Sequence, residues 1–348
     1  MLTLHIDRTR FDANIKAVLA DVPGLVPVAK GNGYGLGIER CADEVVRMGL
    51  DTVAVATYAE AVTVLRRQPG LDRVLVMNPH LPGAPAGELE PGLAGRVVHT
   101  VTTPAAAADL AGRRCVVEFR TPLRRHGIRV DDLAALEPAL AGVRYEGIAV
   151  HLPMRRTKGY EPVAETAAVV EALAARQLAP GYLYVSHMTG KELADLTQRF
   201  PDTKVRARVG TRLWLGDRGA LTAKATVLDV IEIERGERYG YRQLKSLRGG
   251  HLVVVSGGTA HGVGLAAPKP VAGPISRARV LAEGVLAAAN RTLSPYVVGG
   301  KRRWFAETPH MQISLLELPP GSTVPTVGDQ VTLTTRMTTT SFDAVVEG

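Results

Sequence analysis

The chain has little cysteine and no long apolar segment. Its 348 residues include two cysteines, Cys41 and Cys115, which cannot form a disulfide framework and lack the spacing of a metal site. No apolar run approaches the roughly 20 residues that cross a membrane, and the opening residues lack the apolar core of a secretory signal. We therefore expect a cytoplasmic protein with no metal and no membrane partner.

Acidic residues are also fewer than basic ones. The chain has 34 Asp and Glu and 42 Lys and Arg, which gives a net charge of +8. A chain this basic could bind nucleic acid, but its basic residues are scattered and most have acidic neighbours. We expect no nucleic-acid partner. The positive field would instead attract an anionic cofactor or substrate.

A regular alternation of short apolar runs and helical stretches fills the first two-thirds of the chain. The runs are residues 26–29, 52–56, 73–76, 97–100, 115–119, 148–151, 182–186 and 205–209, and the clearest helical stretches are 38–48, 58–67, 162–175 and 191–199. Such alternation predicts parallel β/α units. Eight units predict an α/β fold with a (β/α)8 barrel over residues 9–218, whose catalytic residues lie at the C-terminal strand ends.

Residues 219–348 follow a different pattern. Segments 222–234, 251–256, 312–318 and 330–336 resemble strands joined by Gly and Pro turns, and only 275–289 has a long helical period. We expect a C-terminal β-rich domain. Residues 1–8, with an opening strand at 3–7, are assigned to it.

Lys30 ends the first apolar run, where residues 26–37 read VPVAKGNGYGLG. A lysine at a strand tip can form a Schiff base, and the glycines let a ligand approach the main chain. The alternative is a solvated strand end, the usual place of a lysine. The segment resembles the pyridoxal-phosphate lysine motif of alanine racemases, approximately VVKANAYGHG, and keeps its Lys-x-Asn-x-Tyr-Gly-x-Gly spacing. Because further similar segments follow in the same order, the chain resembles a divergent member of that family.

The resemblance implies a fold type III pyridoxal-phosphate enzyme that racemises or epimerises an amino acid. Racemisation needs an electron sink, which a cofactor supplies because side chains cannot, and two bases on opposite faces of the α-carbon. Lys30 would hold the cofactor and act as one base. Tyr239, in the segment ERYGY, resembles the tyrosine of the family's Ser-Tyr-Gly motif and would be the second. That tyrosine enters the partner's active site in the family, which implies a homodimer with shared sites; the alternative is an ordinary sheet tyrosine beside a turn.

Further cofactor residues are implied at the end of the eighth run. Arg208, in RVGTRLW, matches the family arginine that bonds the pyridine nitrogen, and a guanidinium cannot surrender its proton to that nitrogen. Arg206 is a rival, because strand alternation places it on the same face. The backbone of Gly210 and Thr211 would hold the phosphate.

Other strand ends add to the expected cofactor site. His151 matches a family histidine near the cofactor, although it could equally be a buried structural histidine. The turn SHMTG places Thr189 and Gly190 at the start of a helix, where a phosphate is stabilised. Tyr34 belongs to the lysine motif and is assigned to cofactor binding with it.

The substrate carboxylate is assigned to Arg125, which resembles the arginine of the family's Gly-x-Arg-Leu-Gly segment. Many members orient that arginine with a carbamylated lysine seven positions earlier. Glu118 stands there in this chain, and a carboxylate can pair with arginine without modification. The alternative for Arg125 is one member of a basic loop.

Three departures fall on the substrate side. The tyrosine of the family's Gly-Tyr-Ala-Asp-Gly motif is replaced by Thr259, and the Cys-Met-Asp-Gln segment becomes PHMQ, which brings in His310 and Met311. A phosphate-binding tyrosine near the end is replaced by Phe342. We infer that the cofactor and fold persist and that the substrate is not limited to alanine.

Two other function classes compete with a racemase. Decarboxylases of the same fold carry a catalytic cysteine in a C-terminal motif, but the chain has no cysteine after Cys115; metal-assisted lyases need a His/Cys pair there, of which only His310 is present. A catalytically drifted pyridoxal-phosphate-binding protein is the third interpretation, although such non-catalytic proteins are single barrels.

Overall fold

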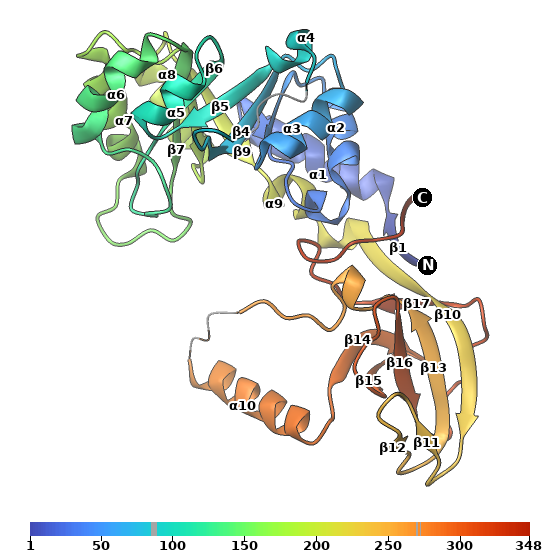
Figure 1. The fold of residues 1–348 in the computed structure, drawn as a ribbon. Coiled ribbons are helices and arrows are strands. Elements are labelled where there is room, and N and C mark those ends of the chain that lie inside the picture. The colour runs from blue at the N-terminus through green and yellow to red at the C-terminus, as the bar shows by residue number, and fades with distance from the viewer. Residues whose placement is uncertain (85–88, 269–270, 272) are drawn as a thin grey trace. The chain divides into compact units, whose positions relative to one another are not determined.

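The computed structural model describes residues 1–84, 89–268, 271 and 273–348. They form two compact units, residues 12–216 and residues 1–11 with 217–348, and Figure 1 shows the elements of both. The first unit is built of parallel β/α units and the second of antiparallel strands. The predicted fold class is therefore confirmed. Within the described residues, no helix is long and apolar enough to span a membrane.

All eight predicted runs form strands of one parallel sheet. They are β2 (Leu25–Pro27), β3 (Thr52–Val55), β4 (Arg73–Pro79), β5 (Val97–Val101), β6 (Arg114–Phe119), β7 (Arg144–His151), β8 (Tyr182–Ser186) and β9 (Lys204–Val209). Their order in the sheet is β2-β9-β8-β7-β6-β5-β4-β3. A parallel bridge between Val28 and Ala54 joins the two outer strands, and Ala29 N–H donates to Ala54 O at 2.8 Å. The sheet thereby curls into a barrel.

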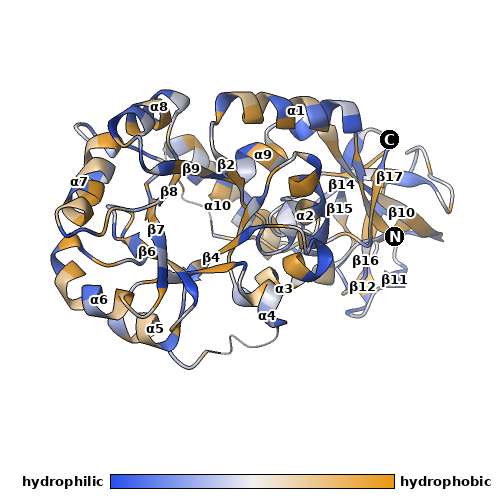
Figure 2. Ribbon diagram, turned by 90° about the horizontal axis from the view of Figure 1, so that it is seen from above, coloured by the Kyte–Doolittle hydropathy of each residue, from blue (hydrophilic) through white to orange (hydrophobic). Residues whose placement is uncertain are grey.

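Helices lie outside this barrel, as the view from above shows (Figure 2). They are α1 (Arg8–Asp21), α2 (Ile38–Arg47), α3 (Tyr58–Arg67), α4 (Pro91–Ala94), α5 (Pro104–Asp109), α6 (Leu133–Leu140), α7 (Pro162–Ala174), α8 (Gly190–Arg199) and α9 (Thr211–Leu215). Short 3-10 turns add residues 33–35 and 130–132. Apolar side chains fill the barrel, including Val26, Leu75, Val98 and Val116, all with no exposed surface. This packing fixes the strand ends from which the site projects.

The second unit is an antiparallel sheet with one long strand at its centre. Its strands are β1 (Leu2–Ile6), β10 (Leu221–Ile233), β13 (Gly250–Ser256), β14 (Leu293–Val298), β15 (Lys301–Phe305), β16 (Ile313–Leu318), β17 (Gln330–Leu333) and β18 (Ala344–Glu347), with the small hairpin β11 (Arg238–Tyr239) and β12 (Leu244–Lys245). β10 pairs with β1, β13 and β17, and β1 also pairs in parallel with β18. The opening strand therefore belongs to the β-rich unit.

Further elements of this unit are the 3-10 turns at Arg218–Ala220 and Thr259–His261 and the helix α10 (Pro274–Ala288), which buries none of its residues. Phe342 is partly buried and packs against the core of the sheet. The sequence pattern did not predict five of these strands, namely β14, β15, β18 and the two-residue strands β11 and β12. The last two are too short to show a period, and the basic residues at the start of β15 hide its alternation.

Candidate active site

Lys30 follows β2 at the C-terminal end of the barrel. The carboxylate of Glu60, in the first turn of α3, accepts the N–H of Gly31 at 2.7 Å through Oε1. Its Oε2 accepts the N–H groups of Ala56 and Thr57 at 2.6 and 2.9 Å, and Thr57 caps the helix in return. Glu60 thus ties the loops after β2 and β3 together and fixes the backbone beside Lys30.

The surroundings of Lys30 disfavour its charged ammonium form. Partial burial lowers the pKa of Lys30, the positive charges of Arg125 and Arg208 lower it further, and Glu60 opposes them. All of these lie in the barrel unit. A lowered pKa increases the fraction of neutral amine, which is the nucleophilic form.

Arg208, at the end of β9, is 4% exposed. Its Nη2 donates to Val150 O at 3.1 Å, whereas Nε and Nη1 are buried without a hydrogen-bond acceptor among the described residues. Burial lowers the pKa of Arg208, and Glu118 counters this. The rival Arg206 lies with its guanidinium 6.0 Å from the ring centroid of Tyr182, the first residue of β8. Of the two arginines, Arg208 is the one whose buried donors have no acceptor among the described residues.

His151 ends β7 and is held by its neighbours. Ser186 Oγ lies 3.2 Å from Nδ1 of His151, and the ring of His187 meets it edge-on at a centroid distance of 5.2 Å. Burial lowers the pKa of His151 to about 2, with help from the charge of Arg208. The His151 ring is therefore neutral at physiological pH.

Tyr34 lies against the backbone of Gly210. Tyr34 is 7% exposed and adopts a left-handed conformation with φ 59°. A Cβ at Gly210 would lie 2.0 Å from Tyr34 Oη, so only glycine allows this approach. Burial raises the pKa of Tyr34 to about 12, which keeps its hydroxyl protonated. Thr211 begins α9 directly after Gly210, and the first N–H groups of a helix have no partner within it.

Thr189 and Gly190 begin α8, as predicted, but the donors of Thr189 are engaged. The N–H and Oγ of Thr189 both donate to Glu192 Oε2, at 2.7 and 2.9 Å. Arg156 pairs with the same carboxylate and lowers the pKa of Glu192. An anion that bonds Thr189 would have to displace Glu192.

Glu118 and Arg125 meet as predicted, although loosely. Glu118 is 1% exposed, Arg125 Nη2 donates to its Oε1 at 3.4 Å, and His126 Nε2 lies 3.1 Å from its Oε2. Arg125 remains partly exposed. The buried carboxylate of Glu118 thus holds Arg125 at the barrel mouth, with His126 beside it.

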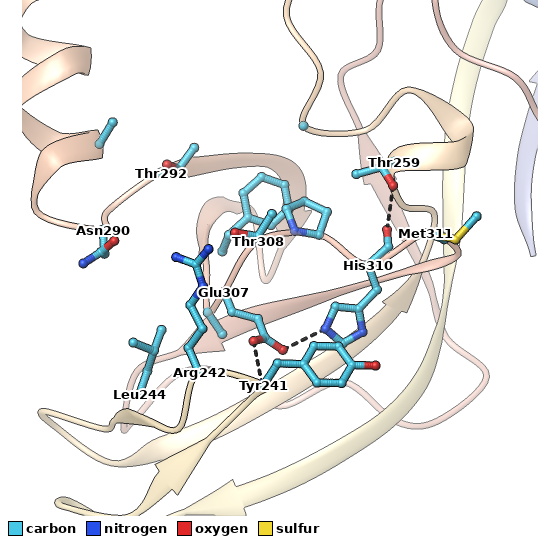
Figure 3. A pocket seen from close by; sticks show the side chains of 15 residues that line it. Tyr241, Arg242, Leu244, Thr259, Asn290, Thr292, Glu307, Thr308, His310 and Met311 are labelled. Atoms are coloured by element: carbon cyan, nitrogen blue, oxygen red, sulfur yellow. Dashed lines mark hydrogen bonds and ion pairs between the residues drawn. The ribbon is translucent and has the colours of Figure 1, made fainter.

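A separate cavity of about 790 Å³ lies in the β-rich unit. Thr259, His310 and Met311 line it together with Tyr241 and Glu307, as Figure 3 shows. Two of the three departures from the family motifs, Thr259 and the segment with His310 and Met311, are thus brought to this cavity, whereas Phe342 packs against the core of the sheet. The carboxylate of Glu307 and the imidazole of His310 face one another inside it.

Tyr239 does not line that cavity. Its hydroxyl donates to Glu317 Oε1 at 3.1 Å, and it faces a smaller cavity with His251 and Trp304. Burial, followed by the charge of Glu317, raises the pKa of Tyr239 to about 12. The hydroxyl is therefore held in its protonated form.

A family model described as "Alanine racemase, N-terminal domain" matches residues 6–207. The chain belongs to the alanine racemase family. A curated relative, the alanine racemase of Symbiobacterium thermophilum, is 31% identical over 159 residues, which cover 42% of this chain and 41% of that protein. The chain thus matches less than half the length of this relative. Family membership confirms the resemblance and supports a racemase, an isomerase.

Solved alanine racemases share the fold at low identity. That of Clostridium difficile 630 superposes with a TM-score of 0.70 at 15% identity, covering 100% of this chain and 96% of that one. That of Bacillus anthracis, solved with bound L-Ala-P, gives 0.69 at 18% identity with coverage of 99% and 87%. That of D-cycloserine-producing Streptomyces lavendulae gives 0.67 at 19% identity with coverage of 100% and 97%. Such identities show the fold alone.

Sequence reasoning missed two carboxylates, Glu60 and Glu307. Glu60 could have been found, because Thr57 and Glu60 have the spacing of a capping box directly after a strand. Glu307 had no such signal, since its partners are placed by tertiary structure. Within the described residues, no group of three His, Cys, Asp or Glu side chains is placed to hold a metal.

The charges around Lys30 predict opposite responses to two substitutions. Arg125→Gln removes a positive neighbour and should raise the pKa of Lys30, whereas Glu60→Gln removes a negative one and should lower it. Pulses of isotopic acylating reagent across a pH series, read by peptide mass spectrometry, report the midpoint at which Lys30 becomes reactive. Shifts of the same sign in both variants would contradict this electrostatic account.

Gly210→Ala should destabilise the barrel unit, because its methyl group would overlap Tyr34 Oη. We expect a loss of about 1–3 kcal/mol in the free energy of unfolding, the usual cost of overpacking, measured by urea denaturation. Gly70→Ala is the matched control, since a Cβ there meets nothing within 4 Å. Adding Tyr34→Phe to Gly210→Ala should recover part of the loss. Equal stability of the two alanine variants would refute the close approach.

Proposed function

We propose that the chain is a pyridoxal-phosphate-dependent amino-acid racemase or epimerase with a two-base mechanism. One observation carries the proposal. The same barrel holds Lys30, whose pKa is lowered, and the buried Arg208, two of whose nitrogen donors have no acceptor among the described residues. Family membership supports the reaction class, and the residues themselves support the cofactor.

The residues at the barrel mouth fit pyridoxal phosphate. The unpartnered Nε and Nη1 of Arg208 are donors for the ring nitrogen, and Gly210 with Thr211 offers open backbone for the phosphate. Lys30 would hold the aldehyde carbon, and the protonated Tyr34 hydroxyl lies beside Gly210 as a further donor. When bound, the cofactor supplies an electron sink for the α-carbon.

The chain's own side chains would then bind and move protons. Arg125, held by the buried Glu118, would bind the substrate carboxylate. Lys30 Nζ would exchange the α-proton on one face of the substrate. His151 stays neutral beside Arg208 and therefore adds no further positive charge. The opposite face needs a second proton-transferring group, for which Tyr239 is the candidate from the sequence.

We also propose a homodimer in which the β-rich unit of one chain completes the site of another. Helix α10 supports association of some kind, because it exposes Ile275, Leu281 and Val285 by 85%, 72% and 71%, and exposed apolar patches mark interfaces. A fully active monomer in sedimentation equilibrium would contradict this proposal.

The alternative lyase chemistry receives less support. Both cysteines are free and buried, and burial raises the pKa of Cys41 and of Cys115, the latter to about 12. A thiol in that state is not a reactive acid or nucleophile. A drifted binding protein would keep Lys30 and the cofactor yet exchange no α-proton, so proton exchange separates it from the enzyme.

Reconstitution should place the cofactor on Lys30. The protein with pyridoxal phosphate should be yellow, and borohydride reduction followed by peptide mass spectrometry should find the adduct on Lys30. Lys30→Ala should release the cofactor on dialysis, and Lys158→Ala, on the same unit but outside the site, is the control. An adduct on a different lysine would refute the assignment.

The substrate should be larger or more polar than alanine, because Thr259 stands where the family has tyrosine and the cavity it lines is about 790 Å³. A racemisation screen by chiral chromatography should rank such amino acids above alanine. Thr259→Tyr should shift the ranking towards small side chains, while Thr259→Ser serves as the small control. A pocket can reject a mismatched polar group far more strongly than the roughly 1–3 kcal/mol of one methylene. A clear preference for alanine that Thr259→Tyr leaves unchanged would exclude this inference.

A further inference from the structure

Glu307 is a buried carboxylate that joins two walls of the cavity in the β-rich unit. Its side chain is 5% exposed. Oε2 accepts the backbone N–H of Tyr241 at 2.9 Å, and Oε1 lies 2.8 Å from Nε2 of His310; Figure 3 shows both interactions. A buried carboxylate is retained at low cost only when it is bonded in this way, so both partners are held in place.

The pairing assigns the tautomer of His310. A carboxylate acceptor at Nε2 keeps the proton on that nitrogen and leaves the lone pair on Nδ1. Among the described residues, no hydrogen-bond partner of Nδ1 is recorded, and the His310 side chain is 23% exposed within the cavity. An imidazole oriented by a carboxylate, with its other nitrogen open, has the arrangement of a general base.

Backbone contacts fix the position of this histidine. Thr259 N–H donates to His310 O at 2.8 Å, and His310 N–H donates to Ile313 O at 3.0 Å. A Cβ at Gly258 would lie 2.1 Å from His310 O, so the turn can approach only because residue 258 is glycine. The ring of Tyr241 lies against His310 with centroids 4.6 Å apart. The backbone of His310 is thus fixed by two hydrogen bonds, and its ring is contacted by Glu307 and Tyr241.

The Tyr239 side chain does not line this cavity. Its hydroxyl is committed to Glu317 and it faces a different hollow of the sheet. Because Gly240 adopts a left-handed φ of 71°, the residues on its two sides face differently, and Tyr241 is the one that reaches the cavity.

We propose that His310, oriented by Glu307, is the proton-transferring residue that the β-rich unit contributes; this rests on the proposed racemase function. His310 Nδ1 would take the α-proton from one face of the substrate, while the electron pair of that C–H bond stays on the substrate. Lys30 Nζ would give a proton to the opposite face, and the roles reverse for the other enantiomer. Glu307 is a positioning residue, whose negative charge stabilises the imidazolium that forms.

The decisive experiment follows each enantiomer separately in deuterated solvent with the reconstituted protein. His310→Gln should slow racemisation by roughly a hundredfold or more, and it should block deuterium exchange from one enantiomer while Lys30 still exchanges the other. His5→Gln, a histidine on β1 that does not line the cavity, is the control and should stay within a few-fold of the wild type. A purely structural His310 would instead impair exchange from both enantiomers equally.

A second measurement does not depend on activity. Ring ¹⁵N shifts of histidine in the cofactor-free protein should show His310 protonated at Nε2 with a free Nδ1, and Glu307→Gln should abolish that preference. The proposal is overturned if the shifts show Nδ1 protonated. It is also overturned if Tyr239→Phe loses racemisation while His310→Gln retains it.

Failure of the proposed function would look different. If wild-type protein forms no reducible adduct at Lys30, the racemase proposal fails at the cofactor, whatever the tautomer of His310. If the adduct forms and both enantiomers racemise, only the His310 variants decide the second base.

Discussion

The buried positive charge of Arg208 is the constraint on which the rest of the barrel site depends. Removing a guanidinium from water costs several kcal/mol unless it is paired and fully bonded, yet Arg208 makes one hydrogen bond through Nη2. Burial lowers the pKa of both Lys30 and His151, and the charge of Arg208 lowers each of them further. Burial and this charge together favour the neutral amine at Lys30 and a neutral ring at His151. Glu118, buried nearby, is the compensating carboxylate that also holds Arg125.

Much of this barrel site follows from the sequence, because it lies at strand ends. Eight apolar runs predict eight parallel strands, and the ends of parallel strands meet at one edge of the barrel. Lys30, His151 and Arg208 could therefore be placed without coordinates. The choice between Arg206 and Arg208 could not, since both share one face; the burial and unpartnered donors of Arg208 and the contact of Arg206 with Tyr182 separate them.

Two of the expected site residues lie in local structure that the sequence does not fix. A threonine at a helix start with a glutamate three residues later can belong to a phosphate-binding loop or to a capping box, and at Thr189 the structure shows the capping box with Glu192. Which of two tyrosines faces a cavity depends on the left-handed residue between them, Gly240. Glycine permits such a backbone without demanding it, so the sequence alone leaves the direction open.

The replaced tyrosine at Phe342 carries less weight than the one at Thr259. Phe342 packs against the core of the β-rich unit, and its neighbour Asp343 accepts Leu2 N–H at 2.7 Å and bonds His261 at 3.0 Å. This segment therefore ties the opening strand to the turn that carries Thr259. A phenyl ring serves that packing without a hydroxyl, so Phe342 is explained by stability. Thr259 lines the cavity directly, beside His310 and Glu307, and the loss of a tyrosine there coincides with a newly placed acid–base pair. The departures from the family motifs at Thr259 and His310 therefore meet in this cavity, whereas the barrel mouth keeps the spacing of the lysine motif around Lys30.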